Sequence, residues 1–550
     1  MRPWLATLFV LGAIGCGHSS KISPVRFALA EPVWAVDDRH HVTEKPSDNV
    51  FAQKLYFTDQ LLYGRLDNSM RLLKDRRAMN VNSRGGVPDS SWWTNRIGFE
   101  ELSAEEVRRG PNQYPDGPST QEPWTVTGGK VGGRAPGFII EDARGDRYVI
   151  KLDPAGKPAI ETSTDVIVQR LLYAFGYHVP ENSVVTFKRE QLHLAPDATQ
   201  EDPFGNKEPM GENDLDDILE RGAQRGAHYR ALASRYVPGI PLGGFPQEGV
   251  RDDDPNDVVP HEHRREVRAI GVVYNWLLHT DVKEDNTLDV YVTGEDGKRF
   301  VRHYMLDFGH GLGANGLLGQ RYGDGYLEYF DWEYFFKSLF AFGFYVRPWE
   351  GYEIPDHPEV GLFLVERYKP WKWRPQAPYF PIRFLDRFDT YWASKIILAF
   401  GQEHLRAAVE AGELGDPSSE DYLIETLQGR ARILARWAFE QVNPLDEFEI
   451  DASHRLCFSD LLLVHGLGPK SPATRYHTVG FDEDGKSSGL SATQNASESG
   501  RVCAEEMLND SLSYQVISLE TLRGDRALDP VEVHIARVED AHRIVGIHRQ

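Results

Sequence analysis

Apolar residues alternate in the strand pattern along one stretch of the chain and recur at helical spacing in the next. Two alternating runs, 138–141 and 147–152, flank a turn and predict a pair of strands. The following stretch, 160–175, predicts a helix that ends at Gly176, a residue type that commonly terminates helices. The apolar positions of this helix are Val166, Val168, Leu171, Leu172 and Phe175.

The next part of the chain predicts more strands around a polar insertion. Residues 180–188 and 229–237 have strand-like composition, whereas 195–222 is acidic and hydrophilic. The acidic stretch is expected to be an inserted loop with one short helix at 214–219. Pro and Gly are frequent in 238–244, which predicts the connection between two lobes, with an ordinary loop as the alternative.

A helix followed by a hairpin comes next. Helical spacing of apolar residues predicts the helix across 260–278. The alternating run 287–293, a turn at 294–297 and a returning run at 300–306 predict two antiparallel strands. This arrangement would place the residues just before and just after the hairpin at the same end of one small sheet.

These patterns predict an α+β protein built from several units. A β-rich small lobe is expected at 116–237 and a helical large lobe at 238–450, with 329–442 forming an aromatic-rich helical core. The aromatic pair Trp92 and Trp93 is expected to pack an extension onto the neighbouring domain, with an exposed ligand surface as the alternative. The remaining predicted parts are a leader and tether at 1–20, an N-terminal extension at 21–115 and a β-rich C-terminal domain at 451–550.

Composition and charge narrow the choice of partners. The chain has 550 residues, too many for one core, and is 41% hydrophobic and 26% charged, as folded proteins are. Its net charge of −22 argues against nucleic acid, which is bound by clustered Lys and Arg. A site for an anionic ligand must therefore be a local positive pocket. Arg264, Arg265 and Arg268 are expected on a solvated face, with contact to phosphate or an acidic substrate as the alternative.

The N-terminus has the pattern of an export signal. Arg2 supplies a positive charge, residues 4–14 are largely apolar, and small residues lead into Cys16. The run 13–16 resembles a bacterial lipobox, although Ala13 stands where such motifs usually have Leu. We expect Cys16 to be lipidated and the protein to be anchored in the cell envelope. Gly17 after the cysteine favours the outer membrane, and a plain signal peptide is the alternative.

Two cysteines remain, Cys457 and Cys503. In an oxidising compartment they could form one disulfide, and two separate thiols are the alternative.

Polar residues suited to phosphoryl transfer lie around the predicted hairpin. Residues 279–286 have the form H-x-D-x-K-x-x-N, and 307–309 are D-F-G. Asp281 could orient an attacking group and Lys283 could face the moving phosphate. Asn286 and Asp307 supply the Asn/Asp pair that holds Mg²⁺ in such sites. Surface acids in loops are the alternative.

A Gly-rich turn at 128–137 precedes the first strand pair. Glycines let backbone N–H groups approach phosphates closely, so Gly133 and Gly137 are candidate nucleotide-binding residues. The turn lacks a strict G-x-G-x-x-G pattern, and a simple hairpin turn is the alternative.

A lysine and a helix acid complete the candidate site. Lys151 lies near the end of the run 147–152 and could hold nucleotide phosphates. Glu161 and Asp165 are four residues apart and share a helix face, so either could pair with this lysine. Asp165 is preferred because it lies further inside the helix, and Glu161 would otherwise be a first-turn residue favoured by the helix dipole.

Taken together, these residues resemble the protein-kinase-like superfamily, and the bacterial HipA-like and spore-coat CotH-like kinases more than ordinary protein kinases. The resemblance covers about 124–440 and is specific at Lys151, 279–286 and 307–309. It implies a bilobal kinase fold that uses ATP and Mg²⁺, with 238–244 holding adenine. The implied roles are catalytic carboxylate for Asp281, phosphate-facing cation for Lys283, metal ligands for Asn286 and Asp307, and nucleotide-binding cation for Lys151.

Departures from the family pattern leave the reaction open. Thr280 stands where many protein kinases have Arg, and no A-P-E follows Gly309. Kinase-like folds also transfer AMP and other groups. The expected function is an envelope phosphotransferase that acts on an unknown protein or small molecule. The alternative is an inactive kinase-fold lipoprotein that serves as a scaffold, because a periplasm holds little ATP.

The lipobox can be tested directly. Cys16→Ser should leave the protein without an acyl group, because the thiol that accepts the lipid is gone. Mass spectrometry and membrane fractionation of the variant check this. An acyl mass on another residue, with the variant still in the membrane fraction, would refute the lipobox.

Overall fold

The computed structural model describes most of the chain and divides it into two compact units. One unit comprises Val33–Val442, and the other comprises Asn443–Gln550 together with the N-terminal residues up to Pro32. Cys16 and Gly133 lie outside the described residues. The described residues are 26–49, 76–130, 135–201, 206–315, 319–320, 322–328, 331–347, 349–468, 474–539 and 541–550.

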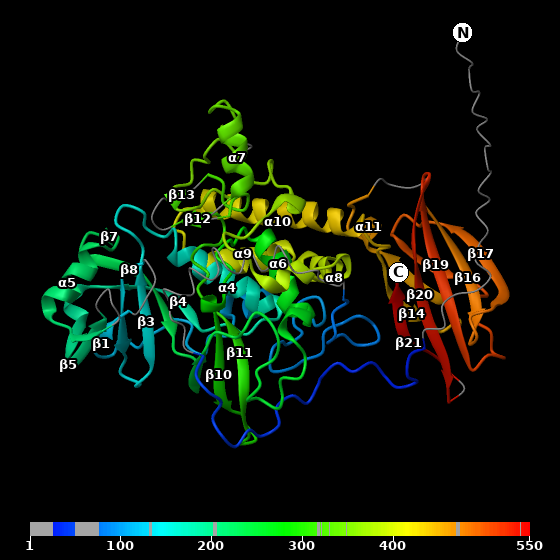
Figure 1. Ribbon diagram of the computed structural model, residues 1–550, viewed down its shortest axis with the longest axis horizontal. Coiled ribbons are helices and arrows are strands. Elements are labelled where there is room, and N and C mark those ends of the chain that lie inside the picture. The colour runs from blue at the N-terminus through cyan, green and yellow to red at the C-terminus, as the bar shows by residue number, and fades with distance from the viewer. Residues whose placement is uncertain are drawn as a thin grey trace, which may run out of the picture. The chain divides into compact units, whose positions relative to one another are not determined.

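An eight-stranded sheet dominates one end of the larger unit (Figure 1). Its strand order is β4-β8-β3-β2-β1-β5-β6, and β7 pairs with β8. The strands are β1 (Trp124–Gly129), β2 (Gly137–Glu141), β3 (Arg147–Leu152), β4 (Asn182–Phe187), β5 (Leu192–Glu201), β6 (Lys207–Pro209), β7 (Gln224–Arg225) and β8 (His228–Arg235).

Alternation along β3 decides which way its side chains point. Tyr148, Ile150 and Leu152 are buried on one face in a core shared with helix α5 (Glu212–Glu220). Lys151 therefore points to the opposite face. The expectation of an inserted loop at 195–222 was wrong in part: β5 pairs with β1 through backbone hydrogen bonds, which a polar sequence can make as well as an apolar one.

Most helices in the described part of this unit lie in its second half. They enclose a core that includes Trp93, which is fully buried against Phe175, Tyr177 and Trp392, as expected for a packed extension. The helices are α3 (Ala104–Arg109), α4 (Thr162–Phe175), α6 (Arg265–Trp276), α7 (Trp332–Phe340), α8 (Arg387–Leu398), α9 (Gln402–Glu410) and α10 (Pro417–Phe439). Among the described residues of 341–386 the only helical elements are short 3₁₀ helices, so the predicted helical run is interrupted there.

The predicted hairpin is present as β10 (Thr287–Thr293) and β11 (Arg299–Met305), which pair antiparallel along their whole length. A third strand, β9 (Ile240–Gly243), pairs with β10. Part of the segment expected to be a connecting loop is therefore a strand. A two-stranded ribbon of β12 (Ala314–Asn315) and β13 (Gly319–Gln320) follows the D-F-G residues.

The three arginines near the start of α6 are buried rather than solvated. Arg265 and Arg268 both pair with Asp389 of α8, at 2.9 and 3.3 Å, and Arg264 pairs with Asp257 at 3.1 Å. For Arg265 and Arg268 the expectation failed because the acid that compensates both charges lies far away in the sequence. Asp389 is 124 residues from Arg265.

The C-terminal unit consists of two sheets that share one core. Strands run through most of residues 445–549, including Ser487–Asn495. One sheet has the order β14-β15-β18 and the other β17-β16-β19-β20-β21, with a short helix α11 (Leu461–Val464) between β15 and β16. The strands are β14 (Leu445–Ile450), β15 (Leu456–Asp460), β16 (Thr474–Asp482), β17 (Ser487–Asn495), β18 (Arg501–Ala504), β19 (Tyr514–Arg523), β20 (Arg526–Val538) and β21 (Ala541–Arg549).

The N-terminal segment of this unit packs on the five-stranded sheet, on the face opposite the core that the two sheets share. The ring of Phe27 lies 4.9 Å from that of His534, and its backbone N–H donates to the Tyr514 hydroxyl at 3.0 Å. Gly546 makes room for the ring, because a Cβ at that position would overlap it. The sheet therefore carries a specific seat for Phe27.

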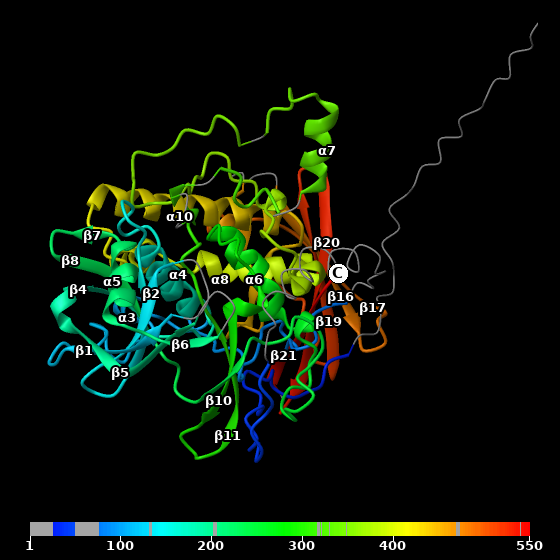
Figure 2. The same cartoon turned by 60° about the vertical axis from the view of Figure 1, so that its left-hand side comes forward.

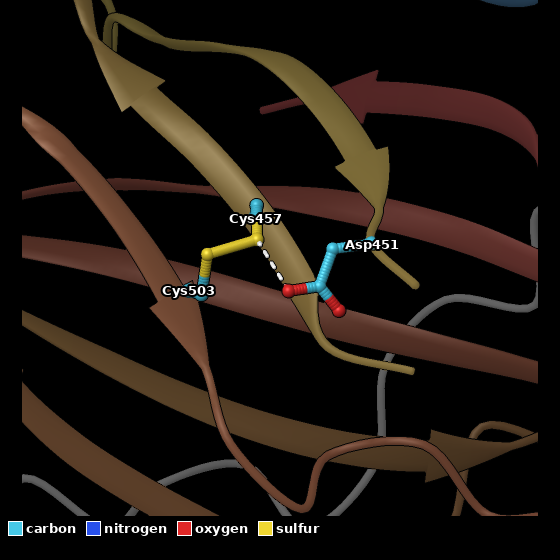
Figure 3. Close-up of side chains that lie close together, drawn as sticks. All are labelled: Asp451, Cys457 and Cys503. Atoms are coloured by element: carbon cyan, nitrogen blue, oxygen red, sulfur yellow. Dashed lines mark hydrogen bonds between the residues drawn. A yellow bond between two sulfur atoms is a disulfide. The ribbon is translucent and has the colours of Figure 1, made fainter. Parts of the chain in front are cut away.

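Cys457 and Cys503 face each other on β15 and β18 and form a disulfide with an S–S distance of 2.04 Å (Figure 3). The carboxylate of Asp451 lies 3.7 Å from the sulfur of Cys457. The alternative of two free thiols is thus not what the structure shows.

An aromatic segment of the larger unit is left uncovered. Helix α7 projects from the rest of the larger unit (Figures 1 and 2). No residue of α7 is buried, and the segment that follows exposes the side chains of Phe342 by 90% and Phe344 by 88%. None of the helices in the described residues is long and apolar enough to span a membrane.

Removal of the disulfide should destabilise the C-terminal unit. The bond closes a loop across 46 residues, which corresponds to about 4 kcal/mol in the chain-entropy description. The double variant Cys457→Ser/Cys503→Ser should lose that amount, measured by amide hydrogen exchange of β19 and β20. Reduction of the wild type should reproduce the loss and should not affect the variant further. Equal protection in all samples would contradict the prediction.

Candidate active site

Residues from three distant parts of the chain meet at Lys151. Its Nζ lies 2.8 Å from Asp307 Oδ1, although the two residues are 156 positions apart, and 3.8 Å from Asp165 Oδ2. The Lys151 side chain is 20% exposed, that of Asp165 3% and that of Asp307 50%. The structure thus brings together the lysine, the helix acid and the D-F-G aspartate that the sequence singled out.

Local hydrogen bonds fix Asp165 in this position. One carboxylate oxygen accepts from Asn182 Nδ2 at 2.6 Å, and the other from the backbone N–H of Phe308 at 3.2 Å. The start of α4 is held by Asp153, whose Oδ1 accepts from the backbone N–H groups of Glu161 and Thr162 at 3.0 Å each. Asp153 follows Lys151 by two residues, so the same strand end places both the lysine and the helix.

Of the two candidate acids, Asp165 contacts the lysine. Glu161 lies just before α4, and its Oε1 is 3.7 Å from His310 Nε2. Burial, with the nearby Asp153 and Asp307 carboxylates, raises the pKa of Glu161 to about 7. Burial also raises the pKa of Asp165 to about 6, against the opposing effect of Lys151.

The loop after α6 arranges the remaining motif residues around Asp281. Its Oδ2 lies 3.0 Å from Lys283 Nζ, and Asn286 Nδ2 donates to its Oδ2 at 3.2 Å and to its carbonyl oxygen at 2.8 Å. Burial disfavours the charged form of Asp281, but Lys283 and His310 together outweigh burial, so the pKa of Asp281 is lowered. Asp281 is therefore a carboxylate at neutral pH.

Aromatic packing around His279 holds the loop after α6 in place. The His279 ring lies 4.3 Å from that of Tyr274 and 6.4 Å from that of Phe308, and burial lowers the pKa of His279 to about 4. The backbone N–H of Leu306 donates to the carbonyl of Asn286 at 2.8 Å. That bond joins the loop to the end of β11, one residue before Asp307.

Asp307 has a left-handed backbone with φ of 57°, which is uncommon for a residue with a side chain. Such conformations cluster at functional sites, where the surrounding structure compensates for their cost. Lys151 holds the pKa of Asp307 well below its usual range. Burial would lower the pKa of Lys151, but Asp307 and Asp165 raise it instead. The pair is therefore charged on both sides.

Donor atoms suited to a cation lie beside this pair. Asp307 Oδ1 is bound by Lys151, whereas Asp307 Oδ2 and Asn286 Oδ1 have no hydrogen-bond partner among the described residues. Carboxylate and amide oxygens are the ligands that Mg²⁺ takes in phosphoryl-transfer sites.

Two further site residues were not identified from the sequence. Lys130 lies in the Gly-rich turn, where burial and the neighbouring Lys151 lower its pKa. His310 lies between Glu161 and Asp281, with its Nδ1 3.9 Å from Asp281 Oδ2. Both could have been found from their positions, one inside the turn and the other directly after D-F-G. Gly137 pairs with Lys151 across β2 and β3, where a Cβ would overlap the carbonyl of Ile150.

Comparison with known proteins gives few matches. No family model and no curated protein matches the sequence. A crystal structure of the Golgi casein kinase aligns with a TM-score of 0.30 and 11% identity over 77% of this chain and 96% of that chain. A structure of the Golgi casein kinase with Mn/ADP bound aligns with a TM-score of 0.29 and 10% identity over 72% and 91%. TM-scores this low define no common fold.

A double-mutant cycle tests which acid partners Lys151. The coupling free energy between Lys151→Met and Asp165→Asn should be about 1–3 kcal/mol, because the groups are in contact and mostly buried. The coupling with Glu161→Gln should stay within about 0.5 kcal/mol. Urea unfolding of the single and double variants gives both values. A larger coupling to Glu161 would reverse the assignment.

Proposed function

We propose that the protein is a kinase-like phosphotransferase of the cell envelope that uses ATP and Mg²⁺. The observation that carries the proposal is the contact of Lys151 with Asp307 and Asp165. Phosphoryl-transfer enzymes of this kind need a cation for the nucleotide, an acid that holds the cation, and an aspartate for the metal. The strand order β4-β8-β3-β2-β1 beside a helical region supports a bilobal arrangement.

Asn286 and Asp307 fit a metal site, since each offers an oxygen with no hydrogen-bond partner in the described part of the chain. A magnesium ion held there would neutralise charge on the phosphates. Lys151 and Lys130 supply further positive charge on the nucleotide side. These two lysines are the cations that would face an anionic ligand on a chain of net charge −22.

Asp281 is placed to act on the acceptor. As a carboxylate it can orient an attacking hydroxyl and accept its proton, while Lys283, 3.0 Å away, faces the transferred group. The acceptor is a hydroxyl of a protein or of a small envelope molecule. Transfer of AMP would use the same residues.

The envelope location is part of the proposal. Its basis is the predicted lipid attachment at Cys16, and the Cys457–Cys503 disulfide supports an oxidising compartment. An inactive scaffold is the second candidate. The expected scarcity of ATP outside the cytoplasm favours it, because an inactive binding protein would not need ATP.

Nucleotide binding provides the first test. Mg-ATP at 100 times its dissociation constant should stabilise the wild type by about 2.7 kcal/mol, measured by thermal unfolding. Asp307→Asn should abolish the Mg²⁺-dependent part, whereas Asp296→Asn on the exposed β10–β11 turn should behave like wild type. An unchanged Mg-ATP affinity in Asp307→Asn would contradict the metal role.

Nucleotide-dependent labelling of the same protein distinguishes an enzyme from an inactive scaffold. Asp281→Asn should keep Mg-ATP binding but lower nucleotide-dependent labelling by about 10²-fold or more, because proton acceptance is lost. Binding without any labelling by the wild type, across protein and small-molecule acceptors, would favour the scaffold.

A further inference from the structure

A cavity of about 220 Å³ lies apart from the candidate active site. It is bordered by the loop after α4, the segment after β8, and β11. None of the residues of the candidate active site described above lines it; Pro238 is the one lining residue from 238–244, the segment that the kinase resemblance assigns to adenine.

Two arginines in its lining have no carboxylate partner. Arg96 donates Nη1 to the carbonyl oxygens of Tyr173 and Tyr177, at 2.7 and 3.2 Å, and its guanidinium stacks 4.0 Å over the Tyr173 ring. Arg302 has a buried Nε without a hydrogen-bond partner. Neither arginine forms an ion pair with any described residue, and burial lowers the pKa of Arg96. Both arginines are part-buried and line the cavity without a carboxylate partner, so they leave positive charge at its wall, which points to an anion.

The other polar groups of the lining do not cancel this charge. Glu181 is held by Arg235 at 2.7 Å, and Arg235 also binds Asp146 at 2.7 Å. His178 is neutral, because burial together with Arg302 and Arg96 holds its pKa well below the ordinary value. Its Nδ1 is buried and has no hydrogen-bond partner.

The rest of the wall is apolar or aromatic. Tyr173, Tyr304, Val179 and Val237 contribute to it, together with prolines on either side. The cavity therefore combines two guanidinium groups with an otherwise largely apolar or aromatic wall, a combination typical of sites for small organic ligands.

We propose that this cavity binds a small organic monophosphate with an apolar body, in which Arg96 and Arg302 contact the phosphate. Guanidinium groups match phosphate oxygens in geometry and charge. The cavity wall is also connected to the active site. The backbone N–H of Met305 in β11, two residues before Asp307, donates to the carbonyl of the lining residue His178 at 2.9 Å. The proposal does not rest on the proposed phosphotransferase activity.

Calorimetric titration of the full chain with phenyl phosphate tests the site. The wild type should bind phenyl phosphate, bind inorganic phosphate more weakly and not bind phenol. Arg302→Gln should weaken phenyl phosphate binding by about tenfold or more, since a charge-assisted contact is lost. Lys298→Gln, which removes the same charge from the exposed turn before β11, should bind like wild type.

Arg96→Gln should show the same loss, but Arg302→Gln carries the test because Arg302 donates to no main-chain carbonyl among the described residues. Lys151→Met should retain binding. The proposal is overturned if the wild type does not bind phenyl phosphate or if Arg302→Gln binds equally well. It is also overturned if binding disappears in Lys151→Met, which would place the ligand in the active site.

Discussion

The contact of Lys151 with Asp307 is the interaction on which the larger unit depends for its candidate chemistry. It joins the end of a strand in the sheet-rich part to the end of the β10–β11 hairpin, 156 residues away. Asp165 links helix α4 to this contact, because its carboxylate accepts hydrogen bonds from Asn182 and from the backbone N–H of Phe308. Three elements with separate cores are thereby held in one geometry, and a shift of any of them would separate the charges. The left-handed backbone of Asp307 persists because these contacts fix it.

Local sequence patterns predicted the strands and helix that carry the site residues. The choice between alternative site residues was decided only by contacts in the folded structure. The hairpin after Asn286 and the helix before Gly176 follow from periodicity and turn residues, so their ends were close to those observed. The choice between Glu161 and Asp165 could not be made from spacing, because both share a face. It was decided by Asn182, which bonds to one of them from the next strand. Gly133 and Cys16 lie outside the described residues, and their roles remain predictions.

Errors arose where stabilising partners are distant in sequence. Polar strands such as β5 gain their stability from backbone pairing with β1, which composition does not reveal. The arginines at the start of α6 resembled a solvated face because Asp389 comes more than a hundred residues later. Buried ion pairs of this kind have no periodic signature. The sequence therefore predicts which residues are charged, and only the fold shows which charges are compensated.

The seat of Phe27 has a mechanical consequence. The segment beginning at Arg26 is attached to the C-terminal unit through Phe27, Gly546 and an Arg26–Glu483 ion pair at 2.6 Å. Force applied to the chain upstream of Arg26 would therefore reach the larger β-sheet of that unit before it reached Val33 and the residues that follow. The contacts of Arg26 and Phe27 with the C-terminal unit would bear that force first. The active-site contacts of the larger unit would bear it only after those contacts had broken.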